Sequence, residues 1–144
     1  MPSDTRGRQL GLPIAAHTLL DMEALRQTAL SSYAVSKRAV ALCAVGVFLS
    51  APPEERDAWM RSLLPPPSIR PFRSLELPIE MHLAIELEAA RLSEALGTLI
   101  SKGVIVVAAA QYYQHLPESA RPPADHRAPR RDQMAAIPAG TARS

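Results

Sequence analysis

Two short segments of the sequence each combine a serine, a lysine and a long apolar run. Ser36, Lys37 and Arg38 precede AVALCAVGVFL, and Ser101 and Lys102 precede VIVVAAAQYY. A serine in front of such a run is typical of a helix N-cap, and the first turn of a helix offers free N–H groups and the positive end of its dipole. A lysine at the same place favours phosphate binding. The plainer interpretation is a solvated helix start.

The remaining reactive residues do not predict an enzyme. The sequence shows no paired carboxylates, no nucleophile with a base and no glycine-rich phosphate loop, so we expect neither catalysis nor a cofactor. His17 and His82 could form a metal or proton-sensing pair, but a histidine in a first helical turn more often packs or makes a surface hydrogen bond, and we expect no metal. The single cysteine, Cys43, excludes an internal disulfide. A reducing cytoplasm is the simplest compartment, and no secretion signal is recognisable.

The segment LGLPIAAH at residues 10–17 returns as LELPIEMH at residues 75–82. Without a gap, residues 8–53 match residues 73–118 at thirteen of 46 positions. The identical pairs include Leu10/Leu75, Leu12/Leu77, Pro13/Pro78, His17/His82, Ser36/Ser101 and Lys37/Lys102. A period of this length indicates one supersecondary unit written twice.

Each copy predicts a short strand followed by two helices. The two leucines before each Leu-Pro pair alternate with other residues, as in a half-buried strand of about five residues. The prolines Pro13 and Pro78 then open amphipathic helices that end near Leu30 and Leu96. The apolar runs after the serine caps fit almost fully buried helices and are too short to cross a bilayer.

This order of elements, with Leu-x-Leu-Pro at the first corner and VSKRAVALCA or ISKGVIVVAA at the second, resembles the ribbon-helix-helix superfamily of Arc, MetJ and CopG. The resemblance covers residues 6–51 and 71–116. It implies a mainly α fold with a two-stranded antiparallel β-ribbon, in which the two repeats form an intramolecular pseudodimer and one globular domain. Residues 1–5 are then a flexible N-terminus, residues 52–70 a proline-rich linker with a short helix containing Trp59, and residues 117–144 a disordered basic tail.

The tandem arrangement is similar to TraY of conjugative plasmids and to the Agrobacterium virulence protein that binds T-DNA borders. The resemblance implies a double-stranded DNA-binding protein, either an accessory factor for conjugative or plasmid DNA or a transcriptional regulator. Its main partner would be DNA, and a relaxase or another DNA-processing protein and further copies of the chain on DNA are possible partners. No membrane partner is expected. The phosphate clamp would consist of Ser36, Lys37, Arg38, Ser101 and Lys102.

In the family the ribbon enters the major groove, and the side chains that face away from the core read base edges. Counting back from each proline places the four leucines inward. The outward positions are therefore Gly7, Gln9, Gly11, Phe72, Ser74 and Glu76, while Arg8 and Arg73 are expected to bend toward DNA near the ribbon ends.

Two outward positions depart from the pattern of a DNA reader. Gly11 carries no side chain, and Glu76 would be repelled by phosphate unless it accepts a hydrogen bond from cytosine. These departures leave open a second function, a protein-protein interaction module that keeps the fold without sequence-specific DNA binding. The pairs of Glu23 with Arg26 and of Glu88 with Arg91 are expected to be solvated helix faces.

Overall fold

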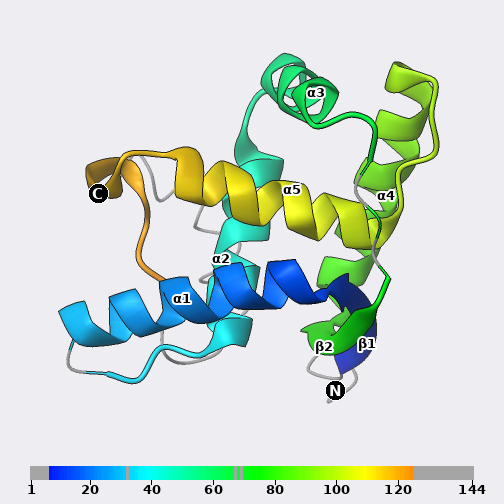
Figure 1. Ribbon diagram of the computed structural model, residues 1–144. Coiled ribbons are helices and arrows are strands. Elements are labelled where there is room, and N and C mark those ends of the chain that lie inside the picture. Colours follow the sequence, from blue (N-terminus) through cyan, green and yellow to red (C-terminus); the bar gives the residue numbers. More distant parts are fainter. Residues whose placement is uncertain (1–6, 32, 67, 69, 125–144) are drawn as a thin grey trace.

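The computed structural model describes residues 7–31, 33–66, 68 and 70–124. The described part is mainly helical with a two-stranded antiparallel sheet (Figure 1). The elements in chain order are β1 (Gly7–Pro13), α1 (Ile14–Leu30), α2 (Lys37–Ser50), α3 (Pro53–Ser62), β2 (Phe72–Pro78), α4 (Ile79–Leu96), α5 (Lys102–His115) and the 3-10 helix η2 (Glu118–Ala120). The predicted flexible N-terminus, residues 1–5, lies outside the described residues.

The ribbon forms by pairing β1 with β2, two strands whose first residues are 65 positions apart in the sequence. Leu10 lies directly opposite Leu75, and the register continues symmetrically to Gly7 opposite Pro78 and Pro13 opposite Phe72. All four strand leucines are buried, which confirms their predicted inward orientation. Each strand ends at a proline in extended conformation, and the first helix of its half begins at the next residue.

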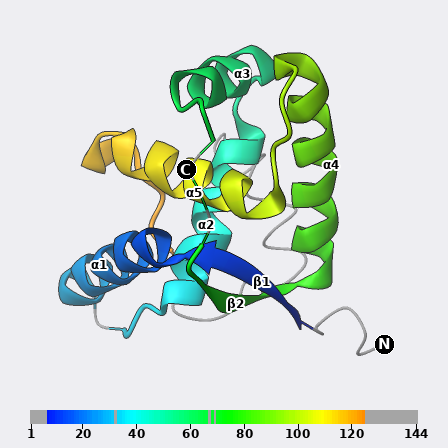
Figure 2. The same cartoon turned by 45° about the vertical axis from the view of Figure 1, so that its right-hand side comes forward.

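Helices α2 and α5 form the centre of the molecule and cross each other, while α1 and α4 flank them on two sides (Figure 2). Both central helices are buried over most of their surface, as predicted from the apolar runs. Their serine caps are also present, since the Ser36 hydroxyl accepts from the Ala39 N–H at 3.0 Å and the Ser101 hydroxyl from the Val104 N–H at 3.3 Å. Gly97 caps the C-terminus of α4, and its φ of 70° favours glycine.

Helix α3 lies in the segment where a short amphipathic helix was predicted, at the end of the molecule opposite the ribbon (Figures 1 and 2). Met60 is fully buried, and Trp59 packs edge-on against Tyr112. The Trp59 indole N–H donates to the Ala108 carbonyl of α5 at 3.1 Å. The linker therefore contributes to the core and does more than join two repeats.

The prediction of a disordered tail beginning at Pro117 is wrong for residues 117–124. These residues pack on α1 and α5, with Ala124 buried and its N–H donating to the Gln27 side chain at 2.7 Å. A proline-rich composition does not exclude packing here, because polar partners on α1 satisfy this backbone. Residues 125–144 lie outside the described part of the chain.

Among the described residues, no helix is long and apolar enough to span a bilayer.

Candidate nucleic-acid interface

The outward face of the ribbon presents its side chains mainly from one strand. Phe72, Ser74 and Glu76 of β2 are exposed, and Phe72 retains 50% of its surface. On β1 the exposed outward side chain is Gln9, which lies opposite Glu76. The face thus combines an amide, a carboxylate, a hydroxyl and an aromatic ring.

The two glycines of this face are covered by side chains of the other strand. A Cβ atom placed on Gly11 would lie 2.8 Å from Cδ1 of the Phe72 ring, and one placed on Gly7 would lie 2.2 Å from a carboxylate oxygen of Glu76. Both distances are too short for real atoms. Gly7 and Gly11 of β1 therefore leave the space that the Glu76 and Phe72 side chains of β2 occupy. Sequence analysis missed this relation.

Arg8 and Arg73 lie at the two ends of the ribbon, opposite Leu77 and Leu12. Their backbone register is that of the core-facing side, yet both side chains are exposed. Bending of these arginines toward DNA remains a prediction. The carbonyl groups of Arg73 and Arg8 also accept hydrogen bonds from His17 and His82.

His17 and His82 attach the first helices to the ribbon. The Nε2 atom of His17 lies 2.9 Å from the Arg73 carbonyl, and Nε2 of His82 lies 2.9 Å from the Arg8 carbonyl. A carbonyl only accepts hydrogen bonds, so Nε2 carries the proton in both rings. Each bond joins a helix of one half to the strand of the other. In the described residues no group of three His, Cys, Asp or Glu side chains could hold a metal ion.

The starts of α2 and α5 carry Lys37 and Lys102, the only two lysines of the chain. Lys37 is three-quarters buried and its Nζ lies 3.7 Å from a carboxylate oxygen of Asp21. Arg38 donates from Nε to the Glu76 carbonyl at 3.1 Å, which ties the first turn of α2 to β2. The equivalent position in α5 is the buried Gly103. The clamp residues thus lie at helix starts, and the start of α2 adjoins the ribbon.

The prediction that the Glu23 and Glu88 pairs are solvated is wrong. Glu23 is only 3% exposed and Glu88 only 6%. Arg26 makes two hydrogen bonds to Glu23, and Arg91 makes two to Glu88, all within 3.1 Å.

A second arginine forms an ion pair with each of these buried carboxylates. Arg121 lies 3.2 Å from Glu23, and Arg56 lies 3.0 Å from Glu88. These two arginines stand at the same 65-residue offset as the repeated segments. The signal was available four residues beyond the last matched proline pair, Pro52 and Pro117, and it extends the sequence repeat into α3 and the segment after α5.

Charge explains how Glu23 stays ionised in this position. Burial acts to raise the pKa of Glu23, but hydrogen bonds from Arg26 and Gln27 and the charges of Arg26 and Arg121 outweigh burial, so this pKa lies below its ordinary value. The carboxylate therefore acts as a structural anion that joins α1 to the segment after α5.

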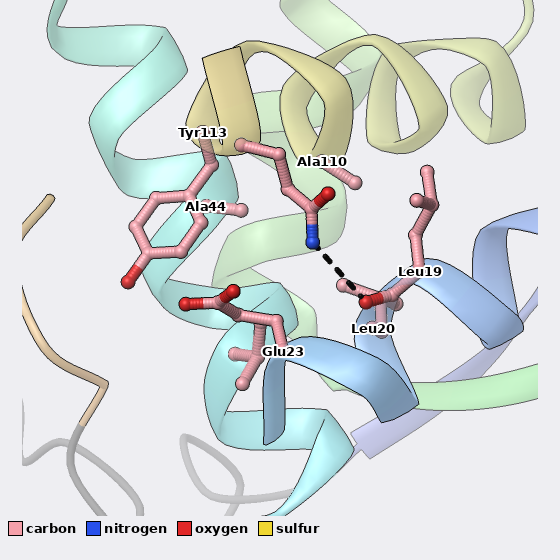
Figure 3. Close-up of a pocket in the computed structure, with 8 residues that line it drawn as sticks. Leu19, Leu20, Glu23, Ala44, Ala110 and Tyr113 are labelled. Carbon is pink, nitrogen blue, oxygen red and sulfur yellow. Dashed lines mark hydrogen bonds between the residues drawn. The ribbon is translucent and has the colours of Figure 1, made fainter. Parts of the chain in front are cut away.

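The same carboxylate and Tyr113 face a small hollow between α1, α2 and α5 (Figure 3). Leu19, Leu20, Ala44 and Ala110 line it as well, and the side chains leave no room for a water molecule. The hollow is part of the packed core and does not provide a ligand site.

Comparison of the chain with family models, with curated proteins and with solved structures finds no match.

Proposed function

We propose that the chain is a double-stranded DNA-binding protein of the ribbon-helix-helix type, with its two repeats arranged as one pseudodimer. The observation that carries the proposal is the antiparallel ribbon, whose exposed polar face bears Gln9 and Ser74. A two-stranded ribbon fits the major groove, where an amide can read adenine and a hydroxyl can read several bases. The clamp lysines at the starts of α2 and α5 supply phosphate contacts.

Several contacts support the paired arrangement, because each contact made by one repeat has an equivalent contact made by the other. Leu10 pairs with its own equivalent, Leu75, at the centre of the ribbon. The two histidine bonds reach the opposite strand at the same distance. The additional arginines also cross over, since Arg56 follows α2 but binds α4, and Arg121 follows α5 but binds α1. Three independent sets of contacts thus support one approximate twofold relation.

Lysine chemistry offers a direct test, because only Lys37 and Lys102 carry lysine amines. The protein is acetylated with and without random-sequence duplex at low salt, and modification at each lysine is measured by mass spectrometry. DNA binding predicts protection of both lysines by duplex and less protection as salt rises. Unchanged lysine reactivity together with no mobility shift at low salt would refute the proposal.

The matched variants are Lys37→Ala combined with Lys102→Ala, and Arg61→Ala as the control. Arg61 is an exposed cation of α3. Helix α3 lies at the opposite end of the molecule from the ribbon (Figure 2). The double lysine variant is expected to weaken binding on every sequence and to reduce the slope of log K against log salt by about two. The control is expected to keep the slope of the wild type.

A protein-protein interaction module is the second candidate function. It is favoured by Phe72 and Glu76 on the outward face and by the pairing of Lys37 with Asp21. A single stoichiometric protein partner whose binding is abolished by Phe72→Ala, in a protein that does not bind duplex, would establish this alternative.

Within the DNA-binding function, we propose an accessory role on conjugative or plasmid DNA or a role in transcription. A neighbouring relaxase gene would favour the first role and make the relaxase a candidate partner, whereas a metabolic operon would favour the second.

A further inference from the structure

We infer that Phe72 is a specificity residue that packs on a thymine methyl group in the major groove, so that the ribbon reads an asymmetric DNA site. The inference rests on the proposed function and concerns what the ribbon recognises. Thymine is the base whose major-groove edge carries a methyl group, and a phenylalanine side chain can contact it without hydrogen bonds.

The position of the ring follows from the strand opposite. Gly11 has no Cβ, and the Phe72 ring occupies the space a side chain there would need, with its Cδ1 atom 2.8 Å from the ideal Cβ position. The ring therefore lies across β1 on the outward face and does not fold into the core. Half of its surface stays exposed, which leaves an apolar contact area for a partner.

The chemistry of the outward face differs between the two ends of the ribbon. One end places Gln9 opposite Glu76, an amide beside a carboxylate that can accept from cytosine. The other end places Ser74 opposite Gly11, with the Phe72 ring over that glycine. An approximate twofold scaffold thus carries a face with no twofold symmetry. The preferred site is expected to be non-palindromic, with thymine under the Phe72 end.

The experiment is selection from a random duplex library by the full chain, followed by replacement of thymine with deoxyuridine in the selected duplex. This replacement removes the methyl group and leaves every hydrogen-bonding atom unchanged. Loss of one buried methyl contact is expected to weaken binding about fourfold at the contacted position. Deoxyuridine at positions outside the ribbon contact is expected to have no effect.

Three variants identify the ring as the cause. Phe72→Ala is expected to bind thymine and deoxyuridine duplexes equally, and Phe72→Leu to retain part of the discrimination. Gly11→Ala places a methyl group where the ring lies, so it is expected to shift the ring and reduce discrimination although Phe72 is unchanged. Leu87→Ala is the control, because Leu87 is an exposed apolar residue of α4 outside the ribbon. Circular dichroism and urea unfolding verify that each variant is folded.

The outcomes separate the inference from the function beneath it. If the wild type binds duplex and discriminates about fourfold, and Phe72→Ala does not, the inference holds. If the wild type binds duplex but ignores the methyl group, or selects a palindrome, the inference is overturned while DNA binding stands. If no duplex is bound at any salt concentration, both are overturned and the interaction-module function gains support.

Discussion

Replacement of Arg121 tests whether the segment after α5 belongs to the folded domain. The Arg121 guanidinium makes three hydrogen bonds, to the Glu23 carboxylate at 3.2 Å, to the Leu116 carbonyl at 3.1 Å and to the Gln114 carbonyl at 3.3 Å. Its side chain is only 13% exposed. The change Arg121→Met removes the charged group and keeps much of the apolar stem.

The expected cost follows from the groups left behind. Breaking a buried ion pair by removing one partner costs about 3–5 kcal/mol when the other charge is left alone. Glu23 keeps its bonds to Arg26 and Gln27, which lowers that cost, whereas the two carbonyls at the end of α5 lose a donor. We therefore expect Arg121→Met to reduce the free energy of unfolding by about 2–3 kcal/mol.

The equivalent change in the other half is a useful comparison. Arg56 makes a single hydrogen bond to Glu88, and its buried Nε has no partner. Glu88 also keeps both bonds to Arg91. Arg56→Met is therefore expected to cost about 1–2 kcal/mol. The exposed Arg61 provides the control, since Arg61→Met should change stability by less than about 0.5 kcal/mol.

Urea unfolding followed by fluorescence of Trp59, the only tryptophan, measures all three variants. This residue reports on the core because its ring packs against Tyr112 and His115. The predicted order of cost is Arg121, Arg56, Arg61. An Arg121 variant as stable as the Arg61 control would show that the segment after α5 does not contribute to the fold in solution, and would refute the crossed arginine arrangement.

Three further predictions concern the core. Burial raises the pKa of the Cys43 thiol to about 11. Iodoacetamide at about pH 8 should therefore leave the folded protein unmodified and label the protein in concentrated urea, and equal labelling under the two conditions would contradict the prediction. The pKa of Glu23 in the folded protein lies below its ordinary value, so its carboxylate stabilises the fold above about pH 5, and this contribution is lost as the pH falls through the folded-state pKa. On acidification the wild type should therefore lose stability more steeply than Glu23→Gln, and parallel pH profiles of the two proteins would contradict this prediction. His17→Ala and His82→Ala each remove one 2.9 Å bond to a strand carbonyl, so each should cost about 1–3 kcal/mol in urea unfolding, and a large effect at one position alone would argue against equivalent roles.

The secondary structure was predictable because the same local signals occur twice. Leu-x-Leu-Pro places a strand before a helix, and a serine before an apolar run places a cap, so agreement between the copies removed the ambiguity of each. The inward leucines and both serine caps are found as predicted. Pairing of the two strands also follows, since a single strand in each copy needs a partner, whereas their antiparallel direction was implied by the family resemblance.

The buried carboxylates were not predictable in the same way. Glutamate three residues before arginine is usual on exposed helices, and nothing local distinguishes Glu23 from a solvated residue. Its burial depends on Arg121, which lies 98 residues later in the chain, in a segment whose composition predicts disorder. The identical spacing of Arg56 and Arg121 was the available signal, but it falls in proline-rich sequence where the match between the copies weakens.

The outward face of the ribbon is where the two copies differ most, and the structure gives this difference a physical reason. Gly7 and Gly11 correspond to Phe72 and Glu76 in the second repeat, so each glycine of one strand stands where the other repeat has a large side chain. Because the strands are antiparallel, Phe72 lies over Gly11 and Glu76 over Gly7. A phenylalanine at position 7 would collide with the Glu76 side chain, and a glutamate at position 11 would collide with the Phe72 ring. The core contacts use the same residues in both repeats, whereas the packed outward face requires different residues in the two strands. Divergence of the repeats at these positions therefore allows one ribbon to present a single asymmetric surface.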